Sequence, residues 1–217
     1  MVEMIRGLRA ELVRENLERA RSAIAAAGRR PGEVEILAAV KYLAPEELPV
    51  LAQAGIELLG ENRAQDLAVK AQAWPGRFTW DFIGHLQSRK VRDVLPYVRY
   101  IHSVATDSVL AQLARHAAPE TEVLVEVNVA REPGKSGVAP SELEAFLERC
   151  PATVVGLMTM PPFTDDPERS RPHFAALREL ASRHNLAQLS MGTSQDYVVA
   201  AQEGATIVRL GTSLYAS

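Results

Sequence analysis

Short apolar runs alternate with stretches of helical periodicity along nearly the whole chain. The first amphipathic stretch covers residues 2–27, where apolar residues recur at helical spacing until Gly28 and Pro31 end the pattern. Eight short runs follow, each apolar or β-branched and each separated from the next by a helical stretch. The predicted strands are residues 35–40, 57–59, 79–83, 100–103, 122–128, 153–158, 188–191 and 206–210.

This alternation predicts an α/β fold. Strands that are apolar on both faces and joined through helices pair in parallel, because each crossover returns the chain to the same edge of the sheet. Eight such units predict a single closed (β/α)8 barrel of the TIM type over residues 1–217, with an extra N-terminal helix. Since the chain stops just past the eighth strand, we expect that helix beside strands one and eight. An open doubly wound sheet, the alternative, would need a glycine-rich turn where the chain reads KYLAPEE.

Composition and charge limit the kinds of partner that the protein can have. With 217 residues, 47% of them hydrophobic, the chain can bury a sizeable core. The single cysteine, Cys150, cannot form an internal disulfide, and neither a signal peptide nor an apolar span of membrane length is present, so we expect a cytoplasmic protein with no membrane partner. The net charge of −3 comes with no basic block, which argues against nucleic acid. We expect a monomer with a small-molecule partner.

Lysine is rare in this chain. Of 24 basic residues, 20 are arginine and four are lysine: Lys41, Lys70, Lys90 and Lys135. A lysine kept in such a background can do what arginine cannot, because its amine can lose a proton and act as a nucleophile. Codon bias would give the same ratio.

The carboxyl ends of the predicted strands carry the polar motifs. Lys41 follows the first strand, GENR and GHLQSRK follow the second and third, and SMGTS and RLGTS follow the seventh and eighth. In such barrels phosphate is often held by the loops after strands seven and eight. Small hydroxyl and glycine residues let backbone amides approach a dianion, so these last two loops predict a phosphate site.

A lysine at the end of strand one is placed to form a Schiff base with a carbonyl ligand. Pyridoxal 5'-phosphate fits this arrangement, with its aldehyde at Lys41 and its phosphate in the two loops. Arg209 would then face the pyridine nitrogen. An arginine there keeps the nitrogen unprotonated and makes the ring a poorer electron sink than one paired with an aspartate.

The motifs resemble those of the pyridoxal phosphate homeostasis protein family, the YggS or proline synthase co-transcribed type, whose barrels are similar to the N-terminal domain of alanine racemase. Eight motifs occur in order: AVKY, GENRAQD, WDFIGHLQSRK, IHSVATD, VEVNVAREPGKSG, GLMTMPP, LSMGTSQD and VRLGTSLY. The resemblance implies that Lys41 carries the Schiff base and that Arg209 meets the ring nitrogen. It assigns phosphate to Ser194, Gly211 and Thr212, and the cofactor lining to Asn62, Met158 and Met160.

The resemblance implies a function in pyridoxal phosphate homeostasis, namely storage, protection and delivery to apo enzymes that use this cofactor, without efficient catalytic turnover. A pyridoxal phosphate-dependent amino acid racemase is the alternative. In the related racemase fold, however, a tyrosine from an additional C-terminal β domain supplies the second base, and we expect no such domain here. A Schiff-base aldolase acting on a sugar phosphate also needs a lysine and a phosphate site.

Several residues have a plainer interpretation. Lys41 could be a strand-end lysine reaching for water, and the two loops could be ordinary turns. The GKSG at residues 134–137 lacks the glycine that a P-loop would need at Val129, so we expect a turn. Lys90 and Lys135 are either solvated or part of a second cofactor site.

The sequence does not assign a role to Glu61 or His85. Glu61 could act as a base or cap the following helix, and His85 could approach the cofactor. The other histidines lack metal-ligand spacing, and we expect them to be structural or solvent-facing: His102, His116, His173 and His184.

Overall fold

The computed structural model describes residues 4–216 and confirms the predicted barrel. Eight parallel strands close on one another in chain order, and β1 pairs with both β2 and β8. The strands are β1 (Glu35–Ala39), β2 (Leu58–Glu61), β3 (Thr79–Phe82), β4 (Tyr100–Val104), β5 (Glu122–Glu126), β6 (Thr153–Met158), β7 (Gln188–Thr193) and β8 (Ile207–Leu210). All eight overlap the predicted runs.

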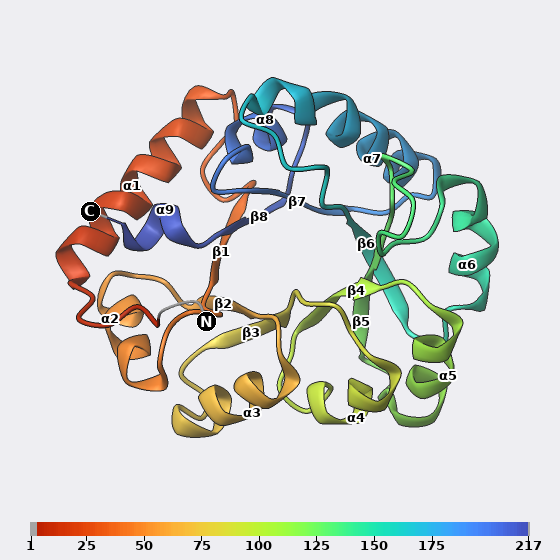
Figure 1. Cartoon of the computed structure of the whole chain (residues 1–217), viewed down its shortest axis with the longest axis horizontal. Helices are drawn as coiled ribbons and strands as arrows, with labels where there is room; N and C mark the ends of the chain where they lie inside the picture. Colours follow the sequence, from red (N-terminus) through yellow and green to blue (C-terminus); the bar gives the residue numbers. More distant parts are fainter. Residues whose placement is uncertain (1–3, 217) are drawn as a thin grey trace.

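Each strand is followed by a helix on the outside of the barrel (Figure 1). These helices are α2 (Leu48–Gln53), α3 (Ala64–Ala73), α4 (Val91–Val94), α5 (Asp107–His116), α6 (Leu143–Arg149), α7 (Arg171–Arg183), α8 (Tyr197–Gln202) and α9 (Thr212–Tyr215). The last of them is only four residues long. Among the described residues, no helix is both long and apolar enough to cross a membrane.

The N-terminal helix begins later than the sequence pattern predicts. Helix α1 covers Ala10–Ala26, so the prediction was wrong for residues 4–9, and residues 2–3 lie outside the described part of the chain. Gly7 has φ +70°, a left-handed conformation that interrupts a helix. Its amide donates to the Glu47 carboxylate at 2.8 Å, and Ile5 forms a parallel bridge with Leu43. Tertiary hydrogen bonds thus hold this segment extended along the loop after β1.

Helix α1 takes the expected outer position. In Figure 1 it lies beside the short helix α9, between α2 and α8. The Asn16 side chain donates to the carbonyls of Leu214 and Ala216 at 3.2 and 2.9 Å, which satisfies two carbonyls at the end of α9. Val13 and Leu17 are buried against the barrel. The N-terminal helix therefore covers the part of the sheet that the short α9 leaves open.

The barrel has a mixed polar and apolar interior inside an apolar shell. The main hydrophobic cluster fills the space between the strands and the helices. Strand residues in register with Arg209 on β8 face inward, and four apolar side chains in that interior are excluded from water: Leu37, Leu124, Met158 and Ile207. Buried polar side chains share the interior with them: Asp81, His102, Ser190 and Arg209. Because buried polar groups need partners, these four must find theirs inside the barrel.

Candidate functional site

A cavity of about 440 Å³ opens at the carboxyl end of the barrel strands. Seven of the eight predicted cofactor residues line it: Lys41, Asn62, Met160, Ser194, Arg209, Gly211 and Thr212. They come from segments that are far apart in the sequence and meet only because the strands end at the same rim. The volume lies in the range typical of small-molecule sites.

Lys41 stands in the turn directly after β1, and its side chain is exposed at the cavity mouth. The ammonium lies 4.8 Å from the centre of the Tyr42 ring. Within residues 4–216 no carboxylate forms an ion pair with it, whereas Lys70, Lys90 and Lys135 all have such partners. The Lys41 amine is thus the lysine nitrogen that both lines the cavity and is open to a ligand.

Three hydrogen-bond donors surround Ser194, which lines the same cavity. Its hydroxyl oxygen accepts hydrogen bonds from the amides of Gly211 and Ser213 at 3.2 and 3.3 Å and from the Ser213 hydroxyl at 2.9 Å. These hydrogen bonds hold the loops after strands seven and eight together, and we refer to Ser194 with its donors as the Ser194 cradle. The loops after strands seven and eight therefore meet at the cavity, and the phosphate site there stays a prediction.

The strand-seven loop is held by its own contacts. Gly192 has φ +91°, and a side chain there would lie 2.5 Å from the Ala200 Cβ. Asp196 accepts from the Thr193 amide at 2.7 Å, and its other oxygen accepts from the Ser170 hydroxyl at 2.9 Å. This loop is consequently fixed without help from a ligand.

Arg209 forms part of the cavity floor and is only 6% exposed. One terminal nitrogen donates to the carbonyl and the hydroxyl of Ser190 at 2.8 and 2.5 Å, and the other donates to the Thr159 carbonyl at 2.9 Å. Burial lowers the pKa of Arg209 to about 10, although Asp196 and Glu126 favour the charged form. The guanidinium is therefore still charged at neutral pH and is held in one orientation.

Behind Arg209 a chain of buried side chains crosses the barrel. His102 Nδ1 lies 2.8 Å from the Ser190 hydroxyl, and His102 Nε2 lies 3.0 Å from Asp81. Asp81 in turn accepts from Arg99, which also donates to Glu35 at the opposite end of the barrel. Because a carboxylate only accepts, Nε2 carries the histidine proton and Nδ1 accepts from Ser190, whose oxygen then accepts from Arg209.

The pKa values in this chain support that assignment. Burial lowers the pKa of His102, and this effect outweighs the opposing hydrogen bond and charge of Asp81. Burial alone would raise the pKa of Asp81, but the hydrogen bonds from His102 and Arg99 lower it overall. The interior thus contains a neutral histidine between an ionised aspartate and a serine.

Met158 is a correction to the predicted site. It is 2% exposed, shares register with Ser190, and faces the barrel interior below the cavity, so it does not line the cavity wall. Met160 lies beyond the end of β6, is 53% exposed and does line it. Alternation gives the two methionines the same face, and their depth separates them: Met158 lies within β6 and is buried, whereas Met160 lies past the strand end.

Glu61 is fully buried and does not line the cavity. Its carboxylate accepts from the amides of Asn62 and Arg63 just before α3 and forms a 2.5 Å ion pair with Lys70. Because α3 begins at Ala64, both amides precede the helix, so Glu61 holds the turn that leads into α3. His85 is exposed and lines the cavity, whereas His102 is buried in the interior chain.

The two loop lysines lie away from the cavity lining. Lys90 pairs with Asp93 at 2.9 Å, and Lys135 pairs with Glu132 at 2.5 Å. Residues 134–137 form a turn between β5 and the helical segment that follows, with φ +115° at Gly137. The prediction of a loop turn at GKSG is confirmed.

Sequence reasoning missed several residues of the site. Ile5 and Tyr215 line the cavity, and Asp81, Ser190 and His102 support its floor. Polar residues inside otherwise apolar strands were the available signal, since each must find a partner in the interior. Ile5 had no such signal, because only the tertiary contact with the loop after β1 places it there.

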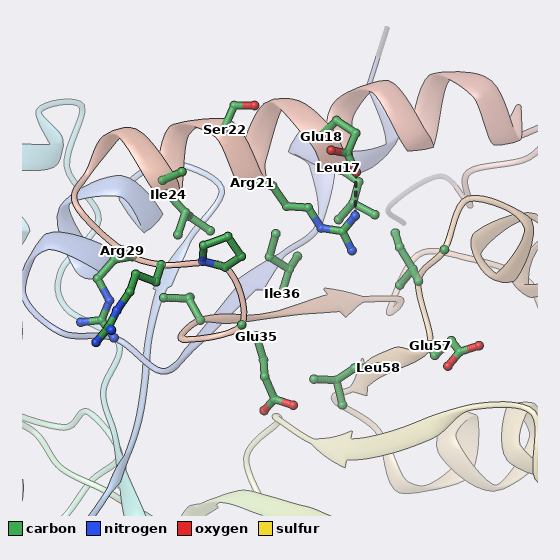
Figure 2. Close-up of a pocket in the computed structure, with 17 residues that line it drawn as sticks. Leu17, Glu18, Arg21, Ser22, Ile24, Arg29, Glu35, Ile36, Glu57 and Leu58 are labelled. Carbon is green, nitrogen blue, oxygen red and sulfur yellow. Dashed lines mark hydrogen bonds and ion pairs between the residues drawn. The ribbon is translucent and has the colours of Figure 1, made fainter.

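A second and larger cavity of about 630 Å³ lies between α1 and the amino ends of β1 and β2. Figure 2 shows its apolar floor, with Leu17, Ile36 and Leu58, and a rim of charged side chains. These rim charges are paired: Arg21 with Glu18, Arg29 with Glu33, and Glu35 with Arg99. We refer to this cavity as the α1 groove.

Comparison with known proteins identifies the family of this chain. The family model for the alanine racemase N-terminal domain matches residues 10–217. A pyridoxal phosphate homeostasis protein of Aquifex aeolicus is 39% identical over 213 residues, which cover 92% of this chain and 93% of the relative. Its counterpart in Deinococcus radiodurans is 40% identical over 204 residues, covering 90% and 95%. The chain belongs to the pyridoxal phosphate homeostasis protein family.

A solved structure of the same architecture extends the comparison. PipY of Synechococcus elongatus, determined with pyridoxal phosphate bound, superimposes with a TM-score of 0.80 at 28% identity and covers 94% of this chain and 99% of its own. PipY thus has the barrel seen here over nearly its full length. The resemblance drawn from the eight sequence motifs is confirmed.

Proposed function

We propose that this chain binds pyridoxal 5'-phosphate as a Schiff base on Lys41 and takes part in intracellular pyridoxal phosphate homeostasis. The observation that carries the proposal is one cavity that holds a free lysine amine, the Ser194 cradle and the Arg209 guanidinium. In the binding step a C=N bond forms between Lys41 Nζ and the aldehyde carbon. The aldehyde oxygen leaves as water together with two hydrogens of the neutral amine.

The residues present fit the three functional parts of this cofactor. Ser194, Gly211 and Thr212 would hold the phosphate, and Arg209 would face the ring nitrogen. Asn62 and Met160 would line the ring. When bound, the cofactor supplies a reactive aldehyde and a conjugated ring that withdraws electrons. A charged arginine beside the nitrogen leaves that ring a weaker electron sink.

This electronic setting favours a carrier over a catalyst, so we propose storage, protection and delivery to apo enzymes rather than turnover. The names of the relatives, pyridoxal phosphate homeostasis proteins, support the same role. We further propose that residues 1–217 act as a single binding domain and as a monomer. The racemase alternative is tested by incubating the protein with alanine in deuterated water. A racemase exchanges the α-hydrogen of alanine for deuterium at a catalytic rate, whereas a carrier does not.

The binding proposal is tested by the absorption spectrum of the purified protein titrated with pyridoxal phosphate. Wild type is expected to develop the visible band of a protonated Schiff base, and Lys41→Ala is expected to lose it. Lys135→Ala is the matched control, because that lysine pairs with Glu132 outside the cavity and should leave the band unchanged. A wild-type protein that stays colourless with excess cofactor would refute the proposal.

A further inference from the structure

The backbone just before Lys41 is held by side chains from two distant elements. The Val40 carbonyl accepts a hydrogen bond from Lys70 Nζ of α3 at 2.7 Å. The Ala39 carbonyl accepts one from the Tyr215 hydroxyl of α9 at 3.3 Å. Burial, together with the charge of Glu61, raises the pKa of Tyr215, so its phenol keeps the proton that it donates. The last two carbonyls of this strand end are therefore anchored from both sides.

Lys70 is paired with Glu61 in the same place. Their side chains are 4% and 0% exposed, and Nζ lies 2.5 Å from one carboxylate oxygen. The other oxygen accepts from the Asn62 amide at 2.6 Å and from the Arg63 amide at 3.3 Å. One ion pair thus connects the backbone before Lys41 to the backbone of Asn62, and both of these residues line the cavity.

Stability alone does not account for a buried ion pair here. Removing two charges from water has a desolvation cost that their attraction often only balances, and an apolar pair of similar volume is commonly as stable. The lysine head group also suits the position, because an ammonium has three donors on a slender stem whereas a guanidinium has five in a rigid fork. In a chain with 20 arginines, this burial of a lysine fits a positional role.

We propose that the Lys70–Glu61 ion pair is the positioning device that aims Lys41 at the ligand aldehyde. Neither residue lines the cavity, so both act through the backbone: Lys70 through the Val40 carbonyl, and Glu61 through the amide of Asn62. This inference rests on the proposed function, since it concerns how the amine of that site is oriented. It predicts that the pair governs covalent capture and leaves the phosphate cradle unaffected.

The test uses the double variant Lys70→Met/Glu61→Gln. Methionine replaces the lysine stem without a charge, and glutamine keeps an oxygen acceptor for the amides of Asn62 and Arg63, so no unpaired charge is buried. The Val40 carbonyl loses its lysine donor. The matched control is Lys90→Met/Asp93→Asn, which removes an ion pair that lies outside the cavity lining.

Two ligands separate positioning from general damage. Pyridoxal phosphate reports covalent capture, measured as the fraction of Lys41 trapped by borohydride at limiting cofactor. Pyridoxine 5'-phosphate has no aldehyde and reports the cradle alone, measured by calorimetric titration. The double variant is expected to lose about tenfold in covalent capture, or ~1.4 kcal/mol, with affinity for pyridoxine 5'-phosphate within about twofold of wild type. The control variant should match wild type with both ligands.

The results that would overturn the proposed function differ from those that would overturn the positioning role. Wild type that traps no cofactor on Lys41 would overturn the proposed function. Wild-type capture with equal capture in the double variant would overturn the positioning role alone, and so would a parallel loss of both ligands, because that pattern describes a collapsed cavity. If circular dichroism shows the double variant unfolded, Lys70→Arg replaces it. That variant keeps the charge but displaces the donor, and unchanged capture with it would refute the inference.

Discussion

The two cavities of this barrel differ in how their polar groups are used. The α1 groove is the larger, at about 630 Å³ against about 440 Å³, yet its rim charges are neutralised by one another. The smaller cavity at the carboxyl end of the strands contains an amine without an ion-pair partner among residues 4–216, and donors that converge on Ser194. The smaller cavity thus differs from the α1 groove in its lysine amine without an ion-pair partner among residues 4–216, rather than in volume.

The interior chain explains why the two ends of the barrel differ. It starts at Arg209 in the smaller cavity and ends at Glu35 on the rim of the α1 groove. At the groove the chain ends in a partly exposed ion pair, whereas at the site it ends in a buried guanidinium. Changes at both ends test this contrast.

The largest effect is expected from comparing one arginine of each cavity. Arg209→Met should lower the free energy of unfolding by about 3 kcal/mol, because it leaves the Ser190 and Thr159 acceptors buried without their donor. Arg21→Met removes only an exposed pair with Glu18 and should change stability by less than about 0.5 kcal/mol. Urea unfolding of both variants measures the difference, and equal losses would contradict the contrast.

The next effect compares one serine of each cavity. Ser194→Ala should weaken pyridoxal phosphate binding about tenfold, or ~1.4 kcal/mol, since it removes a phosphate donor and the acceptor that orders the amides of Gly211 and Ser213. Ser22→Ala, on the rim of the α1 groove, should leave binding unchanged. Calorimetric titration distinguishes them, and a stronger effect at Ser22 would move the site to the other cavity.

A smaller effect is expected on the free energy of unfolding at acidic pH. Because the pKa of His102 is lowered in the folded state, the unfolded chain takes up a proton below about pH 6.5 that the folded chain refuses. Stability should therefore fall by about 1 kcal/mol between pH 7 and pH 5.5, with the lowered pKa of Asp81 adding to the loss at more acidic pH. The variant His102→Gln should flatten the first part of this decline in urea unfolding at the two pH values. A wild-type curve that rises toward acid would have the wrong sign.

The smallest effect is expected at the groove rim. Glu18→Ala breaks the exposed pair with Arg21, so stability should change by less than about 0.5 kcal/mol and cofactor affinity not at all. A fall in affinity would show that the α1 groove communicates with the site through the barrel interior. Titration with pyridoxal phosphate at constant ionic strength checks this.

Most of the fold could be predicted from the sequence, because buried parallel strands are apolar on both faces and alternate visibly with helices. The predicted strand ends also brought Lys41, Ser194 and Arg209 to one rim, where all three line the same cavity. Failures came from tertiary contacts with no local signature. The extended segment at Ile5 depends on pairing with Leu43, which has no signal in the local sequence. Helical periodicity alone therefore predicted a first helix that begins too early.

The contacts behind the cavity wall were similarly hidden. Lys70 has the spacing of a surface lysine on an amphipathic helix, and its burial follows only from the ion pair with Glu61 across the end of β2. Met158 and Met160 are two residues apart and equivalent by spacing, although one faces the packed interior and the other lies past the strand end. Sequence spacing gives the face of a strand, but depth within the barrel requires the register of all eight strands.

The most direct test of the Schiff base on Lys41 is borohydride reduction of the protein mixed with pyridoxal phosphate, followed by peptide mass mapping. We predict one reduced cofactor adduct, on Lys41, with Lys70, Lys90 and Lys135 unmodified because each has a carboxylate partner. The adduct mass also excludes a sugar phosphate aldehyde or ketone as the trapped ligand. An adduct on another lysine with Lys41 unmodified would contradict the assignment of Lys41 as the cofactor-binding amine.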